Sequence, residues 1–404
     1  MTTEVSQQAK PHSHGPGSPV PQQSRAARPT SYDVADFAVL TGREEDWRFT
    51  PLDRVRGLHD GSATPGPGVL VEVDAAEQAK VETVGRDDDR IGRTGKPGDR
   101  VAAQAWSSFE HATVVTFPRE TVATRPTYVT ITGQGKEGAA YAHLIVDAKP
   151  FSTGVVVLDH RGSATLADNV ELIVGDSASL TLVSLADWDD DTVHLSAHQA
   201  KIGRDAMLKH VVVTLGGDVV RITPSAAFAG PGGDVEMLGM YFADSGQHQE
   251  HRLFVDHAEA NCRSRVTYKG ALQGESAHTV WVGDVLIRAN ASGTDTYEVN
   301  RNLILTDGAR ADSVPNLEIE TGEITGAGHA SATGRFDDEQ LFYLQARGIP
   351  QDEARRLVVR GFFVELVQQI GVPELEERLL REIEDELESS MGAAAELAKV
   401  AVGQ

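Results

Sequence analysis

Between residues 162 and 208 one pattern occurs three times: Gly162-Ser163-Ala164-Thr165-Leu166, Gly175-Asp176-Ser177-Ala178-Ser179-Leu180 and Gly203-Arg204-Asp205-Ala206-Met207-Leu208. Each copy places a turn glycine before a small alanine, and an apolar strand residue follows. Asp307-Gly308-Ala309-Arg310-Ala311 is a looser copy. A coiled stack of strands with a small residue at each inner corner requires this pattern, which therefore favours a β-helix over a β-sandwich. Generic turn composition is the competing explanation.

Short apolar, β-branched runs continue on both sides of these copies, and Gly, Asp, Asn and Ser separate them. No amphipathic helical pattern interrupts them between about residues 110 and 330, which argues against a βαβ architecture and predicts one all-β body. The runs are 113–117, 128–132, 144–146, 155–158, 170–174, 180–185, 207–215, 219–223, 235–242, 253–255, 266–268, 280–287 and 303–305.

The region before this body is polar and then helical in pattern. Residues 1–30 hold almost no large apolar side chains, so we expect a disordered tail in which His12 and His14 are inert. Apolar spacing after residue 31 predicts helix, and Thr50-Pro51 is typical of a helix start. Charged, Gly-rich sequence from 86 to 100 predicts a linker.

Helical periodicity returns after Gly334. Pro350 opens one predicted helix, Gly371-Val372-Pro373 ends it, and a second follows with an apolar stripe beside a dense acidic run. The expected fold is mainly β, a right-handed parallel β-helix core with N-terminal and C-terminal α-helical regions. The expected divisions are a tail over 1–30, a helical region and linker over 31–100, the core over 101–334 and a helical region over 335–404.

Composition excludes several function classes. The 37 Lys and Arg residues against 60 Asp and Glu residues leave a formal charge of −23, which argues against nucleic-acid binding. The single cysteine, Cys262, excludes an intramolecular disulfide and a Cys-only zinc or iron–sulfur site built from this chain alone. No apolar run predicts a membrane span, and the N-terminus lacks a signal-peptide core, so a cytoplasmic protein is expected.

Candidate catalytic motifs are weak. Gly92-Arg93-Thr94-Gly95-Lys96-Pro97 fails as a P-loop because Arg90 stands where the first Gly is needed and Pro97 replaces the magnesium-binding Ser or Thr. The chain is therefore not expected to be an ATPase, and no hydrolase elbow or zinc-protease motif occurs.

Three clusters contain residues suited to a metal or redox site. His251 and His257 share a strand face but lie about 20 Å apart along an extended strand, so with His248 they make a poor site for one ion. Residues 187–191 carry four aspartates that suit a hard cation, although a solvated turn is the better reading. Arg263 beside Cys262 can lower a thiol pKa, but an isolated cysteine is more often structural.

Ordered motifs from residue 253 to 347 carry a family resemblance. They are Val255-Asp256-His257, Tyr268-Lys269-Gly270, Gly283, Thr294-Asp295, Asn300-Arg301-Asn302-Leu303, Pro315-Asn316-Leu317-Glu318-Ile319, His329-Ala330, Thr333-Gly334, Gln340-Leu341-Phe342-Tyr343-Leu344 and Arg347-Gly348-Ile349. Together they resemble the SufB and SufD family of iron–sulfur cluster assembly proteins. Glu45-Asp46-Trp47-Arg48-Phe49-Thr50 is similar to an N-terminal signal of that family. His-Ala-Ser-Ala-Thr at residue 329 departs from the family's His-Gly-Ala-Thr.

Within the family the chain resembles the SufD branch more than the SufB branch. SufB-like chains carry a cysteine where this chain has Ile319, and Cys262 lies elsewhere. The resemblance implies a scaffold subunit, not an enzyme by itself, that pairs with a SufB-like paralogue and a SufC-like ATPase. It also implies a transient iron–sulfur cluster shared with the paralogue and a reduced flavin in the complex, for which no sequence feature locates a site.

The resemblance also implies functional residues. His329 is expected at the subunit interface as an iron or cluster ligand, with Glu318 and Glu320 as weaker companions. Capping of a terminal turn is the competing role for this histidine. The C-terminal helices are expected to dock the ATPase through Phe362, Phe363, Glu374 and Glu377. The alternatives are a SufB-like paralogue itself, or a metal-dependent β-helix or cupin-like enzyme that uses residues 248–257.

Overall fold

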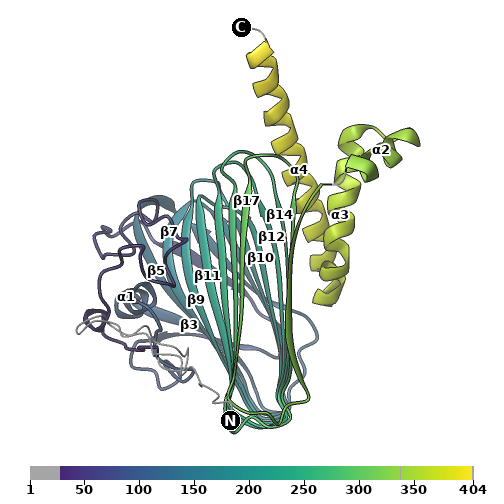
Figure 1. The fold of residues 1–404 in the computed structure, drawn as a ribbon. Helices are drawn as coiled ribbons and strands as arrows, with labels where there is room; N and C mark the ends of the chain where they lie inside the picture. The colour runs from purple at the N-terminus through teal and green to yellow at the C-terminus, as the bar shows by residue number, and fades with distance from the viewer. Residues whose placement is uncertain (1–27, 337, 403–404) are drawn as a thin grey trace, which may run out of the picture.

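The structure is a computed structural model that describes residues 28–336 and 338–402, so residues 1–27 of the predicted tail lie outside the described part. Its body is a coil of strands that forms two nine-stranded sheets, ordered β1-β4-β6-β8-β10-β12-β14-β16-β18 and β17-β15-β13-β11-β9-β7-β5-β3-β2 (Figure 1). From β3 onward successive strands alternate between the sheets, and neighbours within a sheet run parallel. This confirms the expected parallel β-helix.

The strands are β1 (Val69–Asp74), β2 (Lys80–Gly85), β3 (His111–Phe117), β4 (Thr127–Gly133), β5 (Gly135–Ala148), β6 (Thr153–Gly162), β7 (Ala164–Val174), β8 (Ser179–Trp188), β9 (Val193–Ile202), β10 (Met207–Gly216), β11 (Val219–Phe228), β12 (Asp234–Ala243), β13 (His248–His257), β14 (Arg263–Leu272), β15 (His278–Ile287), β16 (Asp295–Ile304), β17 (Arg310–Ile319) and β18 (Gly326–Arg335). The helices are η2 (Val34–Asp36, a 3₁₀ turn), α1 (Arg100–Ser108), α2 (Asp338–Ala346), α3 (Gln351–Ile370) and α4 (Pro373–Val402).

The Gly175 and Gly203 copies of the turn pattern form one corner of the coil, while the Gly162 copy lies at the opposite corner, between β6 and β7. Ser177, Asp205 and Asn261 each adopt a positive φ, between 51° and 57°, that reverses the chain in one residue. The next residue is small and points inward: Ala178, Ala206 and Cys262 are all at most 1% exposed. The small residues predicted at the inner corners are therefore present. Cys262 fills one of these positions, which assigns its thiol a packing role.

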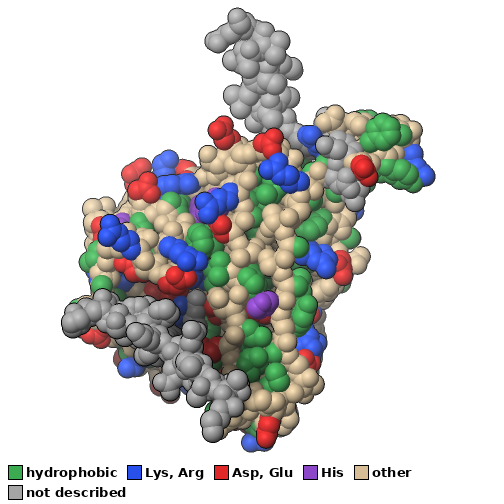
Figure 2. Space-filling view, in the orientation of Figure 1, with side chains coloured by type: hydrophobic (Ala, Val, Ile, Leu, Met, Phe, Trp, Pro, Cys, Tyr) green, Lys and Arg blue, Asp and Glu red, His purple; other side chains and the backbone are tan. Residues whose placement is uncertain are grey.

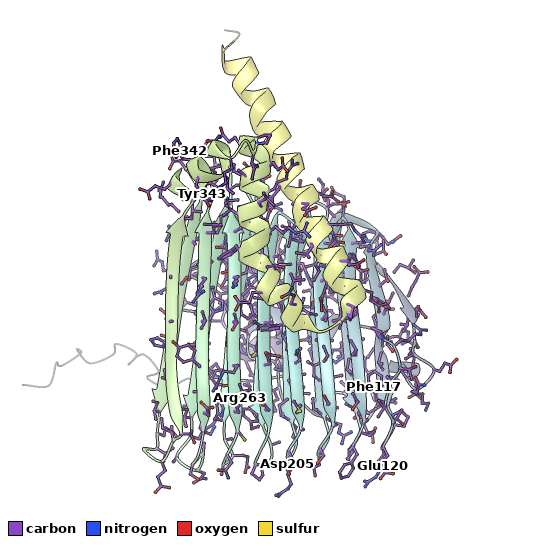
Figure 3. The ribbon with its side chains drawn as sticks, turned by 90° about the vertical axis from the view of Figure 1, so that its right-hand side faces the viewer. Phe117, Glu120, Asp205, Arg263, Phe342 and Tyr343 are labelled. Carbon is purple, nitrogen blue, oxygen red and sulfur yellow. The ribbon has the colours of Figure 1, made fainter. Side chains whose placement is uncertain are left out.

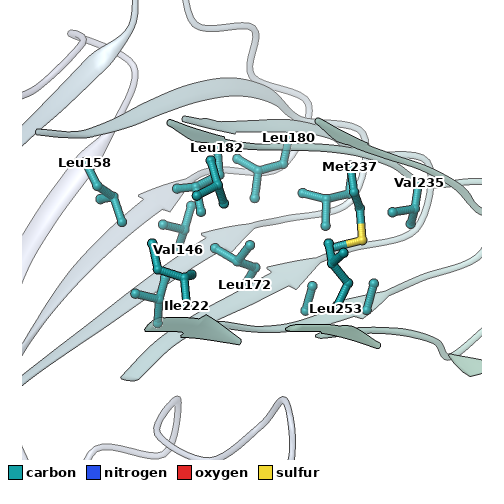
Figure 4. Packing of buried hydrophobic residues seen from close by; sticks show 14 of the residues in the cluster. Val146, Leu158, Leu172, Leu180, Leu182, Ile222, Val235, Met237 and Leu253 are labelled. Atoms are coloured by element: carbon teal, nitrogen blue, oxygen red, sulfur yellow. The ribbon is translucent and has the colours of Figure 1, made fainter. Parts of the chain in front are cut away.

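The lumen between the two sheets is filled mainly by aliphatic side chains. Leu158, Leu172, Leu182, Ile222 and Val235 interdigitate there with little or no exposure (Figure 4). Full burial of each such side chain contributes roughly 1.5–3 kcal/mol. Both faces of most central strands are buried, because other segments cover the outer faces of the sheets.

Helices α3 and α4 lie along the outer face of the sheet that contains β10, β12 and β14 (Figures 1 and 3). Their apolar stripe, which includes Phe363, Leu366, Leu375 and Leu379, packs against that sheet. The stripe therefore completes the core of this chain. The predicted boundary between the two helices is confirmed, since Gly371 ends α3 in the left-handed conformation.

The N-terminal segment covers the opposite sheet, and here the predicted helices are wrong. Apart from η2, residues 31–68 form turns, and β1 and β2 occupy part of the region assigned to helix and linker. Arg56 and Gly57 both have positive φ, which interrupts any helix. The Thr50 hydroxyl donates to Glu250 Oε2 at 2.6 Å across the sheet face, so it serves a tertiary contact in place of an N-cap.

Helix α1 was not predicted, because residues 86–100 were assigned to a linker and residues from 101 onward to the β core. It packs on β7, and the first lumen strand, β3, begins at His111. Among the described helices, none has both the length and the apolar composition needed to cross a membrane.

Candidate functional site

The coil is open at its C-terminal end. β17 and β18 are the outermost strands of their sheets, and no described strand pairs with their outer edges. The outermost strands at the other end are β1 and β2, which differ in pairing antiparallel with their inner neighbours β4 and β3. An unpaired edge presents backbone N–H and C=O groups to a second chain. Figure 1 looks onto the open end, and Figure 2 shows few charged side chains over its middle.

His329 lies on β18, on the side that faces the lumen. In β16 the buried residues alternate as Thr296, Glu298, Asn300 and Asn302, and His329 is the register partner of Glu298. Parallel partners point to the same side of a sheet, so His329 continues the Glu298 position by one rung. It is exposed because no further turn of the coil covers it. The accessible imidazole expected from the sequence is present, in mid-strand, and the turn-capping role is wrong.

A hydrogen-bonded polar cluster supports the strands beneath this edge. Asn300 Nδ2 donates to Tyr241 Oη at 2.8 Å, and Asn302 Nδ2 donates to Asn300 Oδ1 at 2.8 Å. The Ser313 hydroxyl on β17 donates to Asn300 Oδ1 at 2.6 Å. These bonds join both sheets across the lumen. The Asn300-Arg301-Asn302 motif therefore holds the last turns in register.

Glu298 is a residue that sequence reasoning missed. It is 1% exposed, and neither carboxyl oxygen has a hydrogen-bond partner among the described residues. Burial, with a smaller contribution from Asp284, raises the pKa of Glu298 to about 8. An uncompensated carboxyl one rung below His329 is therefore largely protonated at neutral pH. The sequence around Glu298 does not indicate its burial, because only the alternation of side chains along β16 determines that it points into the lumen.

The two expected companions of His329 lie elsewhere. Ile319 is the register partner of the core residue Ile287, so its side chain lies on the lumen side of β17. Glu318 and Glu320 are its sequence neighbours and lie on the opposite side of the strand, so neither glutamate points into the lumen. Glu320 accepts a hydrogen bond from the Ala289 amide at 3.1 Å. The structure therefore does not bring these glutamates together with His329.

The histidines of β13 divide between two faces. His251 and His257 point into the lumen, where they contact Thr214 and Ser264, whereas His248 points to the outer face and contacts Glu250. One ion cannot be shared among these three residues.

The aspartates at 187–191, Cys262 and the P-loop-like segment at 92–97 have structural surroundings. Asp189 and Asp190 are exposed in a turn, and Asp191 pairs with Lys136 at 3.0 Å. Burial raises the pKa of Cys262, opposite to the effect considered for Arg263. The failed P-loop binds a carboxylate of its own chain, since the Gly92 amide donates to Glu171 Oε1 at 2.8 Å.

The four residues expected to dock an ATPase are not equally available. Phe363 is 0% exposed in the core between α3 and the sheet, so it offers no surface to a partner. Phe362 is half-buried, and the Lys269 ammonium lies 5.4 Å from its ring centroid. Glu374 accepts from the Tyr128 hydroxyl at 2.8 Å, and Glu377 is exposed.

A different apolar surface is exposed on the C-terminal helices. Phe342 and Tyr343 on α2 (Figure 3) are 72% and 55% exposed. Leu357 on α3 is 45% exposed. Large apolar side chains grouped in this way mark contact surfaces. The motif Gln340-Leu341-Phe342-Tyr343-Leu344 lies inside the predicted helical region 335–404, but its residues were not among those expected to dock the ATPase.

Comparison with known proteins agrees with this architecture. Residues 129–362 match the family described as SUF system FeS cluster assembly, SufBD core domain. An iron–sulfur cluster assembly SufBD family protein of Mycobacterium bovis is 62% identical over 364 residues, which cover 89% of this chain and 92% of the relative. A Mycobacterium leprae protein of the same description is 60% identical over 88% of this chain and 93% of the relative. The iron–sulfur cluster assembly protein SufD of Bacillus subtilis is 26% identical over 66% of this chain and 62% of the relative.

Proposed function

Because this chain belongs to the SufBD family of iron–sulfur cluster assembly proteins, we propose that it is the scaffold subunit that pairs with a SufB-like paralogue. The observation that carries the proposal is the open end of the coil, where β17 and β18 leave two parallel edges unpaired. A second β-helix can continue both sheets there by edge-to-edge hydrogen bonding. The scaffold has no catalytic activity of its own in this proposal.

His329 supplies this chain's ligand to iron or to a nascent cluster at that interface. A neutral imidazole is a borderline ligand that suits iron, and His329 is exposed on the lumen side of the last strand. Thiolate ligands must come from the partner, because the only cysteine of this chain is buried at a corner of the coil. The cluster is a cargo that both subunits hold and then release.

A SufC-like ATPase docks on the C-terminal helices in this proposal. We assign its apolar contact to Phe342, Tyr343 and Leu357, which are exposed, and no longer to Phe363, which is buried. Glu377 remains exposed for an electrostatic contact on α4, where Phe362 and Glu374 are partly engaged by the chain itself. Nucleotide hydrolysis in the ATPase then moves the helices relative to the open end.

A flavin does not fit the cavity of about 420 Å³ between the N-terminal segment and the sheet. Its arginines are already paired with carboxylates: Arg252 with Asp46 at 2.7 Å, and Arg288 with Asp256 at 2.7 Å. A flavin phosphate would have to break these pairs. No step is therefore assigned to a flavin on this chain.

The test is co-expression of this chain with its SufB-like and SufC-like partners. His329→Ala should leave the three-subunit complex intact and slow cluster formation about tenfold or more, because a directly bound ligand is lost. His111→Ala, at an exposed histidine on β3, is the matched control and should assemble clusters normally. Wild-type cluster formation by His329→Ala would exclude the ligand role, whereas failure to recover any complex would contradict the scaffold itself.

A further inference from the structure

Two histidines from successive turns of the coil meet on the outer face of the sheet that the N-terminal segment covers. His248 is the first residue of β13, His278 is the first residue of β15, and the two are register partners although 30 residues separate them. Their Nδ1 atoms lie 3.1 Å apart. Each imidazole therefore directs the same ring nitrogen toward a common point.

The second ring nitrogen of each histidine faces a carboxylate. His248 Nε2 lies 3.3 Å from Glu250 Oε2, and His278 Nε2 lies 2.7 Å from Asp312 Oδ2. Since a carboxylate only accepts hydrogen bonds, both Nε2 atoms carry the proton. In a neutral imidazole the Nδ1 atom then carries a lone pair.

Arginines neutralise these carboxylates, so the imidazoles are not needed as cations. Glu250 lies 3.4 Å from both Arg221 and Arg252. It also accepts a hydrogen bond from Thr50. Asp312 pairs with Arg310 at 2.7 Å. The two Nδ1 atoms therefore lie at hydrogen-bond distance while both Nε2 protons are directed at carboxylates, so the Nδ1 atoms share either a proton or a metal ion.

We propose that His248 and His278 bind a divalent first-row transition-metal ion through their Nδ1 atoms. Zinc–imidazole bonds of about 2.0–2.1 Å at tetrahedral angles place two ligand nitrogens about 3.3 Å apart, close to the separation of this pair. Carboxylates that accept from the other ring nitrogen are the usual partners of metal-bound histidines, and Glu250 and Asp312 occupy those places. Imidazole suits zinc, copper, iron and nickel.

The ion reaches this pair from the His278 side. The His278 and Asp312 side chains are each 22% exposed, whereas His248 is 2% exposed. Solvent completes the coordination, so the site exchanges its ion. It is separate from the proposed cluster ligand, because His329 lies on the other sheet and faces the lumen. A variant that loses metal binding at His248 and His278 can therefore still be tested for cluster formation at His329, and the reverse.

The experiment is a zinc titration of the full chain against a chromophoric chelator. His12→Gln and His14→Gln are combined as the parent, so that the N-terminal histidines do not contribute. The parent should bind one Zn²⁺, and His278→Gln should weaken that binding about tenfold or more. Asp312→Asn should weaken it less, because only the orientation of the ring is lost. His111→Gln is the control and should bind as the parent does.

Equal zinc affinity in the parent and in His278→Gln would overturn the site, as would a parent that binds no zinc. If His278→Gln does not fold, long-range ¹H–¹⁵N NMR of the parent replaces it, and zinc should shift the Nδ1 signals of both His248 and His278. A spectrum that shows one imidazolium at neutral pH and no response to zinc would mean that a proton, and not a metal ion, lies between the two Nδ1 atoms.

Discussion

The buried carboxyl group of Glu298, near the open end of the coil, makes the folding free energy depend on pH. Glu298 is a buried acid without a hydrogen-bond partner in the described chain, and its pKa of about 8 means that the folded state prefers the protonated form. In the unfolded chain the same group ionises near its ordinary pKa of about 4.3. Between these two values the folded state binds the extra proton, so Glu298 lowers stability as pH rises.

Glu298→Gln should therefore stabilise the protein at alkaline pH. Stability associated with protonated Glu298 is fully present below about pH 4 and is lost as pH rises toward about 8. We expect the variant to match wild type near pH 4 and to exceed it by about 3–5 kcal/mol at pH 8 to 9. Urea denaturation at both pH values measures the difference. A gap independent of pH would show that Glu298 does not titrate in this range.

Glycines beside tyrosines explain the Tyr268-Lys269-Gly270 motif. Gly270 on β14 is the register partner of Tyr241, and Gly239 on β12 is the register partner of Tyr268. Each tyrosine ring lies over the glycine of the neighbouring strand, where a Cβ atom would overlap it. The two rings thus pack in the lumen only because both glycines lack side chains.

Gly270→Ala should destabilise the fold by about 1–3 kcal/mol, since the new methyl group must displace the buried Tyr241 ring. Gly334→Ala on β18 is the matched control, because nothing lies within 4 Å of its added Cβ. Thermal unfolding of both variants tests the prediction. Equal melting temperatures would mean that the lumen accommodates the methyl group without cost.

Among the secondary-structure elements, α3 has two faces with different roles. Its inner face carries Val359, Phe363 and Leu366 against the sheet, and its outer face carries the exposed Leu357. Arg378 of α4 adds an ion pair with Asp159 of β6 at 2.8 Å. The helices are therefore anchored to the coil and still present apolar surface.

Substitutions on the two faces should separate stability from docking. Phe363→Ala removes a fully buried ring and should cost about 3–5 kcal/mol of folding free energy. Phe342→Ala should leave chemical denaturation unchanged and weaken capture of the SufC-like ATPase. Denaturation curves and pull-down of the ATPase distinguish the two effects. Undiminished capture by Phe342→Ala combined with Leu357→Ala would place the docking surface elsewhere.

The two ends of the molecule differ in the direction of their outermost strands. β1 and β2 run antiparallel to their inner neighbours at one end, while β17 and β18 run parallel to theirs at the other. A partner that continues the parallel coil therefore matches the β17 and β18 edges.

Ile319→Lys tests the open end as the joining surface. Ile319 is 46% exposed on β17, and a buried ammonium at the interface should weaken binding of the SufB-like paralogue about tenfold or more. Val122→Lys, at a 63% exposed site between β3 and β4, is the control. Analytical ultracentrifugation of the mixed subunits measures both. Unchanged pairing of Ile319→Lys would remove β17 from the interface.

Local patterns were sufficient for the architecture. The turn copies at Gly175 and Gly203, and the end of α3 at Gly371, depend on backbone preferences of neighbouring residues, so they can be read without the rest of the chain. Motif order predicted the family, and small neighbours predicted the exposure of His329. The apolar spacing after residue 31 predicted helices that are not present. The segment is stabilised by its contacts with a sheet, such as the Thr50–Glu250 hydrogen bond, and not by helical hydrogen bonds.

The functional detail depended on strand register. The positions of Glu298 beneath His329 and of His248 against His278 require knowing which residues one full turn of the coil brings together. Periodicity cannot supply this, because both faces of the central strands are buried and an apolar pattern does not distinguish the lumen from the outer face. The burial of Phe363 likewise followed from where α3 docks. Contacts between residues distant in sequence, each made through the stacked turns, decided these sites.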